Sequence, residues 1–182
     1  MIGDDATGTI DAANYNTGVG VDVFTALTTG DSNVAIGFEG LKDNTTGSNN
    51  VAIGSQTVAN NTTASSNVGI GTGALFTNTT GASNIAIGVQ SLNANTTASN
   101  NTAIGHQSLL SNTTGTENVA VGSEALDANT TGAESVAVGY GALSNATTGS
   151  YNTALGKSAL GSNTTASNNT AVGKSALAST TT

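Results

Sequence analysis

A repeat of 17 residues runs along almost the whole chain and limits the folds that it can adopt. In each of ten successive units a glycine ends a short apolar run. These glycines follow one another at intervals of 17 residues: Gly20, Gly37, Gly54, Gly71, Gly88, Gly105, Gly122, Gly139, Gly156 and Gly173. A constant interval over ten copies predicts an array in which each unit stacks on the next.

The unit itself predicts β-structure. One copy reads Asn84-Ile85-Ala86-Ile87-Gly88, then Ser91-Leu92, then Asn95-Thr96-Thr97. The apolar residues alternate with period two, as in a strand, and Gly, Asn and Thr disfavour helix. We therefore predict an all-β fold: a β-solenoid of about ten 17-residue coils over residues 16–182, after an irregular N-terminal cap or connector over residues 1–15. We expect one strand from the Asn to the Gly, a short second strand around the small residue and Leu, and an extended Thr-Thr pair.

Asparagine recurs at two places in the unit, and stacking would set equivalent amides above one another. One column includes Asn16, Asn33 and Asn50. The other runs Asn44, Asn61, Asn78, Asn95, Asn112, Asn129 and Asn163. We predict amide ladders along both columns. Ser135 interrupts the first column and Ala146 the second, with Asn145 as a candidate to compensate.

The predicted strand is apolar on both faces. In Val119-Ala120-Val121-Gly122 the two valines point one way, and Ala120 and Gly122 point the other. A strand of this kind is normally covered on both sides. We expect the small residues to face a narrow coil interior and the Val/Ile face to pack against other copies of the chain, with a homotrimer as the favoured assembly. The candidate interface residues are Val34, Ile36, Val51, Ile53, Ile85, Ile87, Val119, Val121, Val136 and Val138.

Composition narrows the function. The net charge is −8, with three lysines and no arginine, which argues against nucleic-acid binding. No apolar run approaches the ~20 residues that cross a bilayer, so we expect no membrane insertion. The sequence offers no nucleophile–base pair, phosphate loop or metal cluster, and we predict no enzymatic activity and no cofactor. A single N-terminal ion at Asp4, Asp5 and Asp11 is the one metal alternative.

The repeats resemble a known family. Asn33-Val34-Ala35-Ile36-Gly37 and the equivalent residues 118–122 are similar to the head repeats of trimeric autotransporter adhesins. The longer unit with Asn163-Thr164-Thr165 is similar to repeats of phage tail-fibre and other virion appendage proteins. The resemblance covers about residues 16–178. It implies a left-handed parallel β-roll, three chains side by side, and an exposed fibre that attaches to a host receptor or glycan, on a virion or at a cell surface. The 17-residue unit, and the absence from this sequence of a coiled-coil stalk and a membrane anchor, favour a virion fibre or a fragment of a longer protein over a complete bacterial adhesin.

The residue after each strand glycine varies in chemical character from unit to unit. It is Phe38, His106 or Tyr140 in three units and Val, Ser, Thr or Lys in the rest. A position that tolerates such variety is expected at the surface, where it can tune recognition without harming the fold. We take Phe38, His106 and Tyr140 as candidate receptor contacts, and we expect His106 to be a surface residue and not a ligand or general base.

Two other functions remain open. The array stops within a unit, and an open β edge invites end-to-end stacking, which favours a self-assembling extracellular filament. The Thr-Thr column from Thr45-Thr46 to Thr164-Thr165 is an alternative ice-binding surface, with one Thr per coil exposed. The Asn-x-Thr triplets match N-glycosylation acceptors, although turn formation is the preferred interpretation.

Overall fold

The chain is a parallel β-solenoid, as the repeat predicts. A computed structural model describes residues 13–179, and these contain ten strands of three residues each and no helix. The strands form one sheet in chain order, and each pairs with the next in parallel. They are β1 Thr17–Val19, β2 Val34–Ile36, β3 Val51–Ile53, β4 Val68–Ile70, β5 Ile85–Ile87, β6 Thr102–Ile104, β7 Val119–Val121, β8 Val136–Val138, β9 Thr153–Leu155 and β10 Thr170–Val172.

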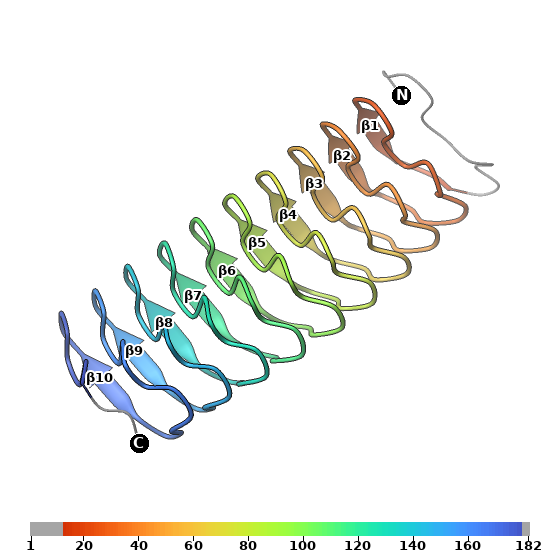
Figure 1. Ribbon diagram of the computed structural model, residues 1–182. Helices are drawn as coiled ribbons and strands as arrows, with labels where there is room; N and C mark the ends of the chain where they lie inside the picture. The colour runs from red at the N-terminus through yellow and green to blue at the C-terminus, as the bar shows by residue number, and fades with distance from the viewer. Residues whose placement is uncertain (1–12, 180–182) are drawn as a thin grey trace.

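Every pairing keeps the same register, so each residue lies beside the residue 17 places later. Ala35 pairs with Ala52, and Ala120 with Ala137. Figure 1 shows the coils following one another along a straight rod, with all strands on the same side. At about 4.8 Å per coil, ten coils span roughly 50 Å. We number the coils by their strands and the positions from the residue before each strand. Coil 3 is thus residues 50–66, and Asn50 is its position 1.

The interior is narrow and holds the small residues, which confirms the predicted direction of the strand faces. The middle residue of each strand is buried, with Ala35, Ala86 and Ala120 fully enclosed. The small residue at position 8 and the Leu at position 9 complete the core, as Ala125 and Leu126 do in coil 7. The Val and Ile residues at positions 2 and 4 point outward.

The predicted second strand is wrong. Positions 8 and 9 lie in a continuous series of turns, and the Thr-Thr pair lies in a bend and not in extended structure. The residue at position 9 has a left-handed backbone in every coil, for example φ 50° at Leu109 and φ 51° at Val58. This conformation costs about 1–2 kcal/mol for a side chain other than Gly. Complete burial of the Leu side chain, worth about 1.5–3 kcal/mol, offsets that cost.

The N-terminal cap and the assembly stay predictions. Most of the predicted cap, and with it Asp4, Asp5 and Asp11, lies outside the described residues. The left-handed coil and the homotrimer come from the resemblance. The described part of the chain contains no helix that could cross a membrane.

Candidate functional site

The most extensive candidate surface is the outer sheet face, which we define as the side chains at positions 2 and 4 of all ten coils. It contains every candidate interface residue named above, and each is partly or largely exposed in the single chain. Ile36, for example, is 40% exposed and Ile85 is 38% exposed. Because the strands pair in register, the side chains at position 4 form an apolar column through all ten coils. Those at position 2 form a second column, in which Val and Ile are interrupted by Thr17, Thr102, Thr153 and Thr170. Contiguous apolar patches of this kind mark surfaces that bind a partner.

A second surface, the edge column, consists of the residues at position 6, directly after the strand glycine. The structure places Phe38, His106 and Tyr140 there, all exposed, with 45% of Phe38 and 50% of Tyr140 accessible. Their exposure confirms that the column is a surface. They belong to coils 2, 6 and 8, so the spacing along the rod is roughly 19 and 10 Å. The three residues share one edge without forming a single cluster.

Tyr140 has the most structured surroundings in the edge column. The Lys157 ammonium lies 5.3 Å from the centre of the Tyr140 ring, within the range of a cation–π contact. Glu124 of the preceding coil hydrogen-bonds the phenol, and this raises the pKa of Tyr140. The ring is therefore positioned from both neighbouring coils.

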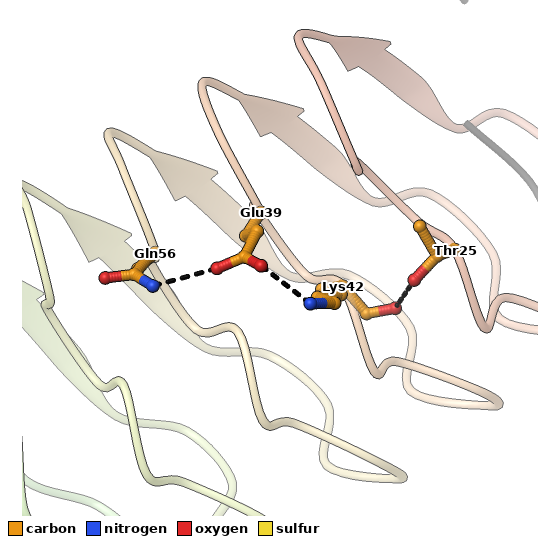
Figure 2. Close-up of polar contacts among 4 residues, drawn as sticks. All are labelled: Thr25, Glu39, Lys42 and Gln56. Carbon is orange, nitrogen blue, oxygen red and sulfur yellow. Dashed lines mark hydrogen bonds and ion pairs between the residues drawn. The ribbon is translucent and has the colours of Figure 1, made fainter. Parts of the chain in front are cut away.

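Polar contacts between coils near Phe38 were missed by the sequence analysis. Figure 2 shows Glu39 between two partners: the Lys42 ammonium at 2.6 Å and the Gln56 amide, which donates to Glu39 Oε2 at 2.8 Å. These hydrogen bonds lower the pKa of Glu39, with Lys42 contributing most. On the other side of Lys42, the Thr25 hydroxyl donates to the Lys42 carbonyl oxygen at 2.9 Å. Coils 1 to 3 are thus connected at this corner by side chains.

The two asparagine columns form the predicted amide ladders, and each amide also serves the backbone. The Nδ2 group of Asn50 donates to Asn33 Oδ1 at 3.1 Å, and that of Asn61 donates to Asn44 Oδ1 at 2.8 Å. Both amides also donate to one carbonyl oxygen of their own coil, that of Ala64, at 2.9 and 3.0 Å. This pair of hydrogen bonds ties position 1 and position 12 to position 15. We call the carbonyl at position 15 the coil-closing carbonyl.

Coil 8, residues 135–151, departs from this arrangement. Ser135 replaces the first asparagine and Ala146 replaces the second. The Ser135 hydroxyl accepts the Asn152 backbone N–H at 3.1 Å, as an asparagine Oδ1 does in the other coils, but it does not donate to the coil-closing carbonyl. The expectation that Asn145 compensates for Ala146 is wrong. Asn145 is exposed and donates to the Gly161 carbonyl, and Asn129 Oδ1 in the preceding coil is buried without a hydrogen-bond partner.

The asparagines of the Asn-Thr-Thr triplets are not available as glycan acceptors in the folded chain. Their side chains are fully buried and donate to the coil-closing carbonyls, as Asn95 does to Ala98. The first Thr donates its hydroxyl to the next coil, as Thr96 does to the Thr113 carbonyl oxygen at 3.2 Å. The second Thr is exposed in every described coil. The triplet therefore forms a turn, as preferred above.

The carboxyl group of Asp127 should make the stability of the folded chain depend on pH. Its side chain is half-buried, its Oδ1 has no hydrogen-bond partner, and burial raises its pKa. A raised carboxyl pKa means that the folded chain binds the proton more tightly than the unfolded chain, so stability falls as the pH rises through the raised value.

We expect Asp127→Asn to raise the free energy of unfolding at neutral pH by up to about 1 kcal/mol, since partial exposure screens the charge. Asn93 already occupies this position in coil 5 and donates to the Gly73 carbonyl oxygen at 2.7 Å. The gain should be complete above the raised pKa and absent below the unfolded-state value. Urea unfolding at neutral and acidic pH measures it, with the exposed Asp43→Asn as the control. A gain that does not depend on pH would contradict the electrostatic cause.

Residues 13–179 line no pocket and bring together no group of three or more His, Cys, Asp or Glu side chains that could hold a metal ion. The surfaces that could bind a partner are therefore the outer sheet face, the edge column and the column formed by the exposed second Thr of each Thr-Thr pair. In comparisons with known proteins, the chain matches no family model, no curated protein and no solved structure.

Proposed function

We propose that this chain is a rod-shaped segment of a virion or cell-surface fibre, in which identical chains pack side by side and the edge column contacts the host surface. The observation that carries the proposal is the outer sheet face. Its position 4 column is apolar through ten coils, its position 2 column is apolar in coils 2 to 5, 7 and 8, and both are at least partly exposed in a single chain. A second copy has the same columns with the same 17-residue spacing, so the two surfaces match along their whole length. Cyclic packing of three chains, as the resemblance implies, covers all of them.

The same geometry supports attachment at the edge column. Strand pairing holds the residues of this column in fixed places, while their chemistry changes from coil to coil through aromatic, basic and small polar side chains. Exposed Phe and Tyr side chains offer large contact areas at low entropic cost, and such residues often dominate binding interfaces. A rigid rod would present several of them along a receptor protein or surface glycan at once.

The mass of the purified chain in solution tests whether chains pack side by side. We expect the purified chain to have the mass of a trimer by light scattering coupled to size exclusion, and Ile87→Lys with Val121→Lys to reduce it to a monomer. The two lysines would place charges in an apolar interface without partners. The control carries Thr97→Lys and Thr131→Lys, two exposed residues on another side of the same coils, and should keep the trimer mass. A monomeric wild-type chain at high concentration would contradict side-by-side packing.

Attachment is tested with the labelled chain on a panel of intact bacterial cells. We expect alanine at Phe38, His106 and Tyr140 together to weaken binding about tenfold or more, because exposed aromatic anchors contribute strongly to contact energy. Thr46, Thr114 and Thr148, exposed residues of the same three coils, give the matched alanine control. Equal binding by the two triple variants would remove the edge column from the proposal.

A further inference from the structure

The coil-closing carbonyl has the same two donors in nearly every coil that is described in full. Coils 2 to 7 and coil 9 each use the amide at position 1 and the amide at position 12. Coil 1 uses only Asn16, because Leu27 stands at position 12. In coil 8 neither donor exists, since Ser135 and Ala146 cannot reach the equivalent carbonyl of Gly149. The Ser135 hydroxyl donates to Ala133 instead.

The coil before coil 8 contains buried polar atoms without a partner. Within residues 13–179, the buried side-chain atoms without a hydrogen-bond partner are Asn129 Oδ1 and Asp127 Oδ1, both in coil 7. Asn129 is fully buried, and Ala146 stands where the next amide of its ladder would donate. Among the hydrogen bonds of the described chain, none is accepted by the Gly149 carbonyl oxygen. A buried acceptor without a donor destabilises the folded form, because it has lost its contact with water.

Both ladders are therefore broken in one coil. In a solenoid each coil contacts only its neighbours, so stability is close to a sum of local contributions and a weak coil is not supported from a distance. Regions of low local stability open first while the rest stays folded. Coil 8 keeps its strand pairing and its buried Leu143, so it is folded but less firmly closed than coils 2 to 7.

We propose that coil 8 is a built-in joint, at which the rod opens locally before any other internal coil does. It separates coils 2 to 7 from coil 9, all of which have both donors to the coil-closing carbonyl. The inference depends on the solenoid itself and not on the proposed attachment function. Its consequence is that pulling, proteolysis or partner exchange acts first on residues 135–151.

Hydrogen–deuterium exchange of the complete chain, followed by mass spectrometry, tests the joint. Coil 5, residues 84–100, is the internal reference because both of its donors are present. After correction for intrinsic rates, we expect amides of coil 8 to exchange about tenfold faster or more than those of coil 5, the effect of losing one or two net hydrogen bonds. Equal protection of the two coils would overturn the proposal.

Two double variants test whether the missing amide donors cause the faster exchange of coil 8. Ser135→Asn with Ala146→Asn restores both donors and should slow exchange in coil 8 to the rate of coil 5. Asn84→Ser with Asn95→Ala transfers the substitutions to coil 5 and should make that coil exchange fast as well. Fast exchange in coil 8 that the restoring variant leaves unchanged would overturn the proposal, as would a coil 5 that stays protected after the transfer. The comparison within the wild-type chain stands even if one variant fails to fold.

Discussion

Gly105→Ala should destabilise the rod by roughly 3 kcal/mol or more, a large effect for the addition of one methyl group. Gly105 directly follows strand β6 and has φ +138°, a conformation that L side chains rarely adopt. A Cβ atom there would lie 2.5 Å from the carbonyl oxygen of Gly122 in the next coil. This oxygen belongs to the stacked backbone and cannot move without displacing the next coil. Overpacking and a strained backbone therefore add at one residue. Urea unfolding followed by circular dichroism measures the loss.

The matched control is Gly141→Ala, in the turn two residues after a strand glycine. Its φ is +59°, but the nearest atom to an added Cβ is the Ser158 Oγ at 3.8 Å. Other coils carry Glu39 and Gln107 at this position with φ 54° and 56°. We expect a loss of about 1 kcal/mol, the ordinary penalty for a left-handed residue. Similar losses for the two variants would mean that close stacking of the strand glycines does not limit the sequence.

The repeat made much of the architecture predictable. A fixed period requires equivalent residues to lie beside one another, so the parallel register, the asparagine ladders and the inward direction of Ala35 all follow from one alignment of the units. The exposure of the edge column follows from its variability. What the period leaves open is the path of the chain between strands.

The turn at position 9 shows why that path was mispredicted. Leu and Val rarely adopt a left-handed backbone, and a sequence such as Ser91-Leu92 suggests a strand. The conformation at Leu92 is stable only because the coil must return within 17 residues and still bury this side chain. Such a balance between local strain and burial depends on the closed coil, and local propensity does not contain it.

The contacts between coils and the missing amide donors of coil 8 can both be recognised in the sequence. Glu39 and Gln56 are 17 residues apart, and so are neighbours in any stacked arrangement. Ser135 and Ala146 are the two exceptions to the asparagine columns and fall in one unit. Comparing each unit with the next reveals both features. What could not be read from the sequence is that both asparagines serve one carbonyl, because this depends on the folded corner.

Asn95→Asp should be more damaging than any truncation of the ladders, with an expected loss of about 4 kcal/mol or more at neutral pH. The substitution keeps the shape of the side chain and replaces its amide by a carboxylate. The Asn95 amide donates to Asn78 Oδ1 at 2.8 Å and to the Ala98 carbonyl oxygen at 3.0 Å. A carboxylate would set negative oxygen against both acceptors in a site with no exposure to water. Asn95→Ala leaves mainly one orphaned acceptor, as Ala146 does naturally, and should cost only about 1–3 kcal/mol.

Burial should raise the pKa of the carboxyl that Asn95→Asp introduces, so the variant should recover stability as the pH falls through that raised value and the charge is neutralised. Asn100→Asp is the control: the same change five residues later, at an exposed position where coil 6 carries Glu117. It should alter the free energy of unfolding by less than about 0.5 kcal/mol. Unfolding titrations of both variants at neutral and acidic pH separate the two cases. If Asn95→Asp is as well tolerated as Asn100→Asp, the buried amides are not required as donors, and neither the ladder nor a joint at coil 8 can depend on them.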